Sequence, residues 1–476
     1  MASRIACVAF VLVATVAASA AASAAPLTLQ EAVRYALTHN STIASRQATL
    51  ANLEANFAKA HAAEFPPISG SLSNTMARSS NALGSFAQIG ATPASRFSQN
   101  TAQIGTQWTL YNGSLNQILA QESKRQVEGA REDLRQSQNQ ITQSVVSAYY
   151  SVASKSNATL LANSNLSYQQ TLFSVAQAKE RAGMIAGVDV LRADAALQQA
   201  SAAKISAESD EATARENLAQ LIGAPVETTF AAQAALPQPA LPAAPLDTLL
   251  QTAHVSRPDI ASAAANVAFA RLSRAAIDAD LRPQIALNAA FGNQTSPTTF
   301  VNQQAQIDSL NQFCRLAPTD PNCSGAPFPN VARGTPGFWQ ISATSTFAVP
   351  LIDYGTRRAQ HRAGDEQIDS ALLNLISVQT AADADVRQSL RGAQTALATL
   401  GYQRKAASLA TESARIAQLQ YKNGLISLTD VNAAQQTALS AQTDYFNARV
   451  AYINAIVKLR SSLGTLDPLS IVADLH

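Results

Sequence analysis

The fold is decided by a stretch that occurs twice in the chain. Residues 29–68 read LQEAVRYALTHNSTIASRQATLANLEANFAKAHAAEFPPI, and residues 246–285 read LDTLLQTAHVSRPDIASAAANVAFARLSRAAIDADLRPQI. The two copies align without a gap at an offset of about 217 positions, so that Leu29 recurs as Leu246 and Ile68 as Ile285. This period is far longer than the roughly 20 to 50 residues of a solenoid repeat. The chain is therefore built from two homologous halves.

The repetition continues to the end of each half. Leu110, Gly183, Ile185, Asp189 and Val190 recur about 241 positions later as Leu351, Gly424, Ile426, Asp430 and Val431. The offset grows because the second half carries a longer loop at residues 292–338. We divide the chain into a signal segment (1–25), a first repeat (26–223), a Pro-rich connector (224–245), a second repeat (246–464) and a tail (465–476).

The first 25 residues have the pattern of a secretory signal. Arg4 precedes an apolar run at residues 5–16, and Ala22, Ser23 and Ala24 provide a small-residue cleavage site. A run of about 12 apolar residues is too short for a transmembrane helix. We therefore expect an exported chain, and no lipid is expected on Cys7, which lies inside the signal.

The composition of the mature chain excludes several classes of protein. No later apolar stretch reaches the length of about 18 residues that a membrane-spanning helix needs. The chain has 34 basic against 32 acidic residues, and its 14% of charged residues provide no basic field for nucleic acid. Cys314 and Cys323 lie in a segment rich in Pro and Asn with no His nearby, which favours one loop disulfide over a metal site.

No arrangement of residues indicates an enzyme. His39, His61, His254, His361 and His476 are scattered, and none is spaced three or four residues from another. The sequence contains neither a Gly-rich phosphate loop after a strand nor a nucleophile elbow. We therefore expect no catalytic residues, no cofactor and no metal.

Each half contains two predicted strands in which apolar residues alternate with small or polar ones. The apolar positions are Ile68, Gly70, Leu72 and Met76; Ala102, Ile104, Trp108 and Leu110; Ile285, Leu287, Ala289 and Phe291; and Trp339, Ile341, Ala343, Phe347 and Val349. Taken alone, each strand fits a half-buried sheet as well as a membrane strand. A length of about 10 residues and aromatic residues near the strand ends favour the membrane. Four strands cannot close a barrel, so several chains must share one.

Very long helices follow each pair of strands. Thr28 and Glu31 form a capping box that opens a helical segment ending at Pro66. Residues 114–181 and 356–422 carry heptad-spaced apolar residues and no Pro, which predicts two coiled-coil rods, each on the order of 100 Å long. Each rod ends at a glycine, Gly183 or Gly424, and a second helix then runs back to Gly223 or Gly464.

The turns between these helices invite two interpretations. Gly183 and Gly424 coincide in the repeats, and so do Asp189 and Asp430. A glycine supplies a left-handed helix end, and an aspartate in the first turn complements the positive end of the next helix. In the functional interpretation, the paired tips form a mouth, and its carboxylates select or bind what passes.

The duplicated order of helix, strand, loop, strand, long helix, turn and return helix resembles the TolC-type outer membrane efflux channels. The resemblance covers nearly the whole mature chain and includes Leu110-Tyr111-Asn112 and Leu351-Ile352-Asp353-Tyr354-Gly355 at the strand-to-helix joins. It implies a mainly α, internally duplicated fold, in which long coiled-coil helices form an α-barrel and four transmembrane β-strands join a shared trimeric 12-stranded β-barrel. Such a protein lies in the outer membrane with a large periplasmic part.

The resemblance also implies function, partners and site residues. The protein would be the passive exit duct, for small molecules or proteins, of a tripartite efflux or type I secretion system. Its partners would be a periplasmic adaptor protein, an inner membrane pump of RND, ABC or MFS type, and outer membrane lipid, with no cofactor. The alternative is a periplasmic coiled-coil adaptor or scaffold, which would have a single helical hairpin flanked by compact β modules.

The residues of the periplasmic gate would be Asp189, Tyr421 and Asp430, with a hydrogen bond from Tyr421 to Asp189. Two positions depart from the family pattern, because Ile426 stands in place of an Arg and Ala433 in place of a second Asp. The helix tips that would contact the adaptor are Gly183, Met184, Gly424 and Leu425.

Overall fold

The structure is a computed structural model in which 27–79, 95–225, 228, 230, 236–280, 282–295, 297–324, 327–329, 337–347 and 352–467 are described. The predicted signal segment lies outside these residues, as does most of the tail.

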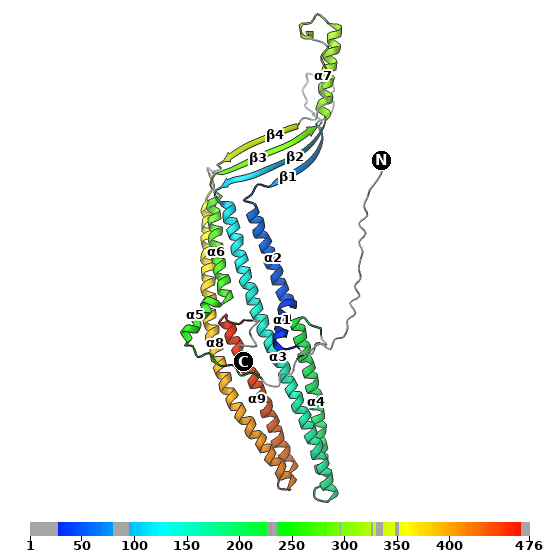
Figure 1. Ribbon diagram of the computed structural model, residues 1–476, viewed down its shortest axis with the longest axis vertical. Coiled ribbons are helices and arrows are strands. Elements are labelled where there is room, and N and C mark those ends of the chain that lie inside the picture. Colours follow the sequence, from blue (N-terminus) through cyan, green and yellow to red (C-terminus); the bar gives the residue numbers. More distant parts are fainter. Residues whose placement is uncertain are drawn as a thin grey trace, which may run out of the picture. The chain divides into compact units, whose positions relative to one another are not determined.

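The elements follow the order predicted for a duplicated chain (Figure 1). The first repeat contains α1 (Leu29–His39), α2 (Ser41–Ala62), β1 (Ile68–Ser79), β2 (Ser95–Asn112), α3 (Leu115–Arg181) and α4 (Gly187–Ile222). The second contains α5 (Leu246–Ser256), α6 (Pro258–Ala279), β3 (Gln284–Thr295), α7 (Pro297–Leu316), η1 (Pro321–Cys323), β4 (Gly337–Thr346), α8 (Thr356–Lys422) and α9 (Leu428–Ser462). The fold is mainly helical, as predicted, and the described strands form one small sheet.

The chain forms two compact units that cut across the two sequence repeats. One unit, called the helical unit below, contains residues up to Thr49, Ala130–Ser262 and the chain from Ile376 onward. The other, the sheet unit, contains Leu50–Gly129 and Ala263–Leu375. Each unit thus takes corresponding parts from both repeats, and the rods α3 and α8 contribute to both units.

The sheet unit contains the four predicted strands in one antiparallel sheet of order β1-β2-β3-β4. Its register places the predicted apolar residues of all four strands on the same face of the sheet. Gly70 lies opposite Ile104, Ile104 opposite Phe291, and Phe291 opposite Trp339. The large side chains on this face are exposed, among them Ile104 at 60% and Trp339 at 76%. One bulge, between Thr109 and Tyr111, interrupts the pairing of β2 with β3.

The joins from strand to long helix use the same backbone conformation in both repeats. Gly113 and Ser114 have positive φ angles of 67° and 69°, and the corresponding Tyr354 and Gly355 have angles of 47° and 85°. Two consecutive left-handed residues turn the chain sharply, although the glycine stands first in one join and second in the other. An Asn or Asp side chain closes each turn, because Asn112 Oδ1 accepts from Asn116 N and Asp353 Oδ1 accepts from Gly355 N.

The long segment between β3 and β4 contains a helix that the sequence pattern does not reveal. A loop is predicted over residues 292–338, but β3 continues to Thr295 and α7 then occupies Pro297–Leu316. Pro297 stands at the first position of this helix, where its missing N–H costs nothing. Its polar composition, with six Asn or Gln residues between 302 and 312, hides the helical period from an apolar pattern search.

In the helical unit, the hairpins α3–α4 and α8–α9 pack against the short helices α1 and α5. One cluster of buried side chains joins α1 to α3, α4 and α9, with Val33, Tyr150, Ile222 and Ile453 at its centre. A second cluster joins α5 to α8 and α9, with Ala253, Val386 and Ile456 fully buried. The Pro-rich connector is fixed to α9, because Tyr452 Oη donates to Pro239 O and Arg449 Nη2 donates to Leu236 O, each at 2.6 Å.

Equivalent residues tie the short helices to the ends of the return helices. Asn40 Nδ2 donates to Leu221 O at 2.8 Å, and its counterpart Arg257 donates from Nη1 to Ser462 O at 3.1 Å. The two repeats therefore use different side chains to hold the C-terminal end of the short helix against the end of the return helix. Arg257 is 8% exposed, and although burial alone would lower its pKa, hydrogen bonds and charges from Asp259 and Asp385 raise it.

This junction of short helix and return helix yields a stability prediction. Gly464 has a φ of +70°, and a Cβ placed there would lie 2.6 Å from the backbone carbon and oxygen of Ser256. We expect Gly464→Ala to lower the apparent Tm of the purified protein by several degrees, since the left-handed conformation alone costs about 1–2 kcal/mol for a residue with a side chain. Gly392→Ala, in open space within α8, is the control and should raise the Tm slightly. A Gly464→Ala protein that melts no lower than this control would contradict the close packing of Gly464 on Ser256.

Candidate functional site at the helix tips

Both hairpins of the helical unit turn at the glycines that the repeat had marked. Gly183 and Gly424 have φ angles of 72° and 73°. At the first turn Met184 N donates to Lys179 O, and at the second Leu425 N donates to Gln420 O, each at 2.9 Å. Together with the bonds from the two glycine N–H groups, these contacts form a Schellman motif that closes α3 and α8 alike. This part of the structural interpretation of the turns is confirmed.

The return helices begin differently at the two tips. At the start of α9, Ser427 and Asp430 form a capping box in which Ser427 Oγ donates to Asp430 Oδ2 at 2.7 Å. At the start of α4 the cap is Ala186, which has no side-chain oxygen, and Asp189 instead accepts from Arg192 Nη1 at 3.2 Å. One of the two matched carboxylates therefore holds its own helix end, and the other is paired with an exposed arginine.

Apolar contacts bind the two hairpins to each other close to these turns. The buried members come from all four helices: Leu172 and Ala176 of α3, Ala193 of α4, Ala417 and Tyr421 of α8, and Leu428 and Val431 of α9. Tyr421 is the largest of them and is 4% exposed. Ile426, which stands where the family pattern has an arginine, packs against the same cluster.

Lys179 of α3 joins the two hairpins directly. Its Nζ donates to the backbone oxygen of Tyr421 at 2.9 Å and also lies 4.2 Å from the centre of the Tyr421 ring. The ammonium group thus satisfies a carbonyl near the end of α8 and makes a cation–π contact at the same time. The lysine provides a polar link between the α3 and α8 tips, next to the apolar cluster that also joins them.

The predicted hydrogen bond from Tyr421 to Asp189 is wrong for the single chain. Tyr421 Oη is buried and has no hydrogen-bond partner among the described residues. Burial raises the pKa of Tyr421, and the charge of nearby Asp189 raises it further. Burial, with a smaller effect from Tyr421, also raises the pKa of Tyr168 to about 12. Both hydroxyls therefore stay protonated at neutral pH.

A cavity of about 300 Å³ lies between the two tips. Its charged lining residues are Lys179, Asp189 and Arg192 of the first hairpin and Lys422 of the second, and Tyr421 lines it as well. Large apolar side chains are also exposed at the tips, since Met184 is 73%, Leu191 70% and Leu425 71% exposed. The structure thus brings Asp189 and Tyr421 to one cavity, which the exposed Met184 also lines, and leaves Leu425 on the surface.

Sequence reasoning missed Lys179 and Arg192. The spacing of three residues between Asp189 and Arg192 was a readable signal for an ion pair on one helix face. Lys179 carried no such signal, because its partner Tyr421 belongs to the other repeat and meets it only through the packing of the hairpins.

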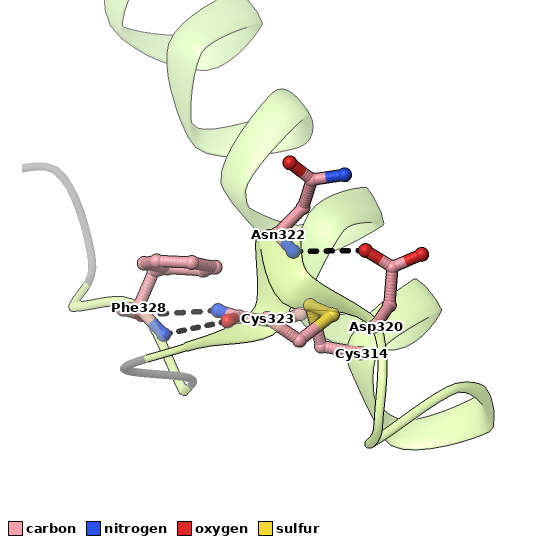
Figure 2. Close-up of a disulfide and its surroundings, with 6 residues drawn as sticks. Cys314, Asp320, Asn322, Cys323 and Phe328 are labelled. Atoms are coloured by element: carbon pink, nitrogen blue, oxygen red, sulfur yellow. Dashed lines mark hydrogen bonds between the residues drawn. A yellow bond between two sulfur atoms is a disulfide. The ribbon is translucent and has the colours of Figure 1, made fainter.

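The two cysteines of the mature chain lie in the sheet unit, away from these tips in sequence. Cys314 of α7 and Cys323 of η1 form a disulfide (Figure 2). Beside it, Phe328 N donates to Asn311 Oδ1 at 2.7 Å, and Asn311 Nδ2 donates to Phe328 O at 3.0 Å. The segment after α7 is therefore fastened back onto the helix at two points.

None of the described helices is both long and apolar enough to cross a membrane. The described side chains also include no group of three His, Cys, Asp or Glu residues that could hold a metal ion.

A family model of known proteins matches most of the chain. The model described as "Outer membrane efflux protein" matches residues 32–224 and 249–465, one match in each repeat.

Individual proteins and solved structures are also similar. Protein CyaE of Bordetella pertussis is 26% identical over 197 residues, which make up 41% of this chain and 40% of that protein, so the chain matches less than half the length of this relative. A membrane protein from Pseudomonas aeruginosa is 19% identical with a TM-score of 0.72, and the match covers 93% of this chain and 92% of the other. The Campylobacter jejuni CmeC outer membrane channel is 15% identical with a TM-score of 0.72, covering 94% and 89%. These two structures share the fold.

The position of Lys179 predicts a looser tip when its charge is removed. Lys179→Met loses the bond to the Tyr421 carbonyl and the cation–π contact, so amide hydrogen exchange around Gly183 and Gly424 should become several-fold faster. Lys405→Met, an exposed change on α8, is the matched control and should leave tip exchange unchanged. Equal exchange rates in the two variants would show that Lys179 does not hold the hairpins together.

The unpaired hydroxyl of Tyr421 gives a prediction of opposite sign. Tyr421→Phe removes a buried polar group without a partner and should leave the protein as stable as before or stabilise it by about 1 kcal/mol. Thermal unfolding of the purified protein measures this difference. A clear loss of stability would mean that the hydroxyl has a partner in the assembled protein, such as a carboxylate of a neighbouring copy.

Proposed function

We propose, from the premise that this chain belongs to the outer membrane efflux protein family, that it is the outer membrane exit duct of a tripartite export system. Membership places the protein in the outer membrane and makes it a channel protein rather than an enzyme. The finer proposal is a homotrimer that receives its cargo from an inner membrane pump through a periplasmic adaptor. The cargo passes without chemical change, so no cofactor is required.

The main observation in favour of a trimer is that the four-stranded sheet is open at both edges. β1 and β4 form its edges, and neither has a partner on its outer side among the described residues. The exposed apolar face suits contact with lipid, but a sheet in lipid cannot keep open edges. Further copies of the chain supply the missing partners, and three copies of four strands give a barrel of the size that the family resemblance implied.

The long helices support the same assembly. Leu373, Ile376, Tyr402 and Leu409 of α8 are all more than half exposed in the single chain. A row of exposed apolar side chains on a coiled-coil helix indicates a surface that another helix covers. The adaptor or scaffold alternative does not account for two hairpins and a four-stranded sheet in one duplicated chain.

The helix tips are the proposed periplasmic mouth. Gly183, Met184, Gly424 and Leu425 form the two turns, and the exposed Met184 and Leu425 present apolar surface to an adaptor protein. Asp189, Tyr421 and Asp430 remain the proposed gate residues. We add Lys179 to this proposed group because its Nζ donates to the Tyr421 carbonyl, and Asp430 would combine a gate role with its place in the capping box of α9.

Fractionation and mass measurement test the proposed assembly. The protein should sediment with outer membranes and, after extraction in a mild detergent, have the protein mass of three mature chains by light scattering. A monomer in the soluble periplasmic fraction would refute the proposal.

The charge of Asp430 can be separated from its role as a cap. Asp430→Asn keeps an oxygen that can accept from Ser427 but removes the negative charge, so the cation preference of the channel in planar bilayers should fall while the helix stays intact. Asp444→Asn, an exposed carboxylate further along α9, is the control and should leave the reversal potential almost unchanged. Unchanged selectivity in Asp430→Asn would leave Asp430 with the capping role alone.

A further inference from the structure

We propose that β4 of one copy pairs with β1 of the next in one defined register, in which Ser345 lies opposite Leu72, Ala343 opposite Asn74 and Ile341 opposite Met76. The proposal rests on the proposed function, because it presumes that copies of the chain share one sheet. It adds the residue pairs at the contact between copies.

The internal duplication first identifies equivalent positions in the two hairpins. Ile68 of β1 pairs with Thr106 of β2. Ile285, the counterpart of Ile68 in the second repeat, pairs with Ser345 of β4. Thr106 and Ser345 therefore occupy the same place in their respective hairpins by strand pairing, which differs by two residues from the sequence match of Leu110 with Leu351.

The seam between β2 and β3 then shows how one hairpin joins the next. Across this seam Thr106 pairs with Ala289. Ala289 is the counterpart of Leu72, because it lies as far beyond Ile285 as Leu72 lies beyond Ile68. If one copy joins another as one repeat joins the other, Ser345 pairs with Leu72 of the neighbouring copy. The two pairs that follow, Ala343 with Asn74 and Ile341 with Met76, result from antiparallel pairing.

The pairs that this register brings together are chemically suitable. Ile341 and Met76 are 68% and 77% exposed in the single chain and would cover each other. All six residues lie on the apolar face of the sheet, whereas a slip of one residue would turn one strand over. A slip of two residues would keep the faces but place Ile341 opposite the polar Asn74.

The register also gives the sheet a constant stagger. A row of paired residues runs across the sheet from Ile68 through Thr106 to Ala289. Ala289 lies four residues beyond Ile285, the counterpart of Ile68. The row continues to Ile341 and, in the proposed register, reaches Met76 of the next copy, a further four residues along. The advance is equal at both hairpins because the proposed register treats the two repeats as equivalent units, and the advances of all hairpins add up to the fixed total stagger of a closed barrel.

The helical unit also fits the assumption that one copy joins the next as one repeat joins the other. Within one chain α3 lies against α9, because Gln169 Nε2 donates to Asn432 Oδ1 at 3.3 Å. The counterparts of Gln169 and Asn432 in the other repeat are Ala410 of α8 and Leu191 of α4. Leu191 is 70% exposed in the single chain. If copies join as repeats do, α8 of the neighbouring copy lies against α4 in the way that α3 lies against α9. Ala410 of that copy then covers Leu191 with an apolar contact.

Cysteine cross-linking in outer membranes tests the register. Directly opposite residues on paired strands have Cβ atoms about 4.5–5.5 Å apart, whereas diagonal neighbours are about 7–8 Å apart and too distant for a disulfide. A chain with Met76→Cys and Ile341→Cys should be oxidised by copper phenanthroline to covalent trimers at least about tenfold faster than one with Asn74→Cys and Ile341→Cys. Each single-cysteine chain is a further control, since the native Cys314–Cys323 pair is already closed within one chain.

A second pair, Leu72→Cys with Ser345→Cys, tests the same register at another point and replaces the first if that variant fails to assemble. Faster cross-linking of the Asn74 and Ile341 pair would overturn the register while leaving the shared sheet in place. A wild-type protein that is monomeric in detergent, with no cross-linking from any pair, would overturn the proposed function as well.

Discussion

Backbone hydrogen bonding at the two edges of the sheet is the constraint on which the rest of the structure depends. Among the described residues of the single chain, β1 and β4 each carry a row of outward-facing N–H and C=O groups without partners. In water such an edge is tolerable, but in hydrocarbon each unpaired group costs several kcal/mol. A chain of the outer membrane efflux protein family cannot meet this cost alone. Under the proposed function, assembly is therefore part of its folding, and assembly and lipid would cover the exposed apolar residues of the strands and of α8.

The duplication shows which features of the fold are fixed by geometry and which by particular side chains. The left-handed turns after β2 and β4 occur at matching positions, yet the glycine stands first in one pair and second in the other. The corner between short helix and return helix is fastened by Asn40 in one repeat and by Arg257 in the other. Backbone conformation and donor position have been kept, while the side chains that provide them have changed. The same comparison identifies Lys179 as an asymmetric feature, because its counterpart in the second repeat is Gln420.

Much of this architecture could be predicted from the sequence because it depends on local patterns. Alternation in the strands indicated the face on which Ile104 and Phe291 lie, and Gly183 and Gly424 marked the two turns. Helix α7 was missed because its apolar residues do not form a clear helical stripe. The contact of Lys179 with Tyr421 could not be predicted, since it depends on how two hairpins far apart in sequence pack together. The expected bond from Tyr421 to Asp189 failed for the same reason: a residue match identified the groups but not the distance between them.

Hydrogen exchange of the strand amides in the membrane-bound protein tests the central claim most directly. If neighbouring copies complete the sheet, the outward-facing amides of β1 and β4 are hydrogen-bonded and should exchange as slowly as those of the central strands β2 and β3. If each chain keeps its own four-stranded sheet, the outward-facing amides of β1 and β4 should exchange orders of magnitude faster than the inward-facing amides of the same strands. That second pattern, in protein that is fully inserted in outer membranes, would contradict a sheet shared between copies.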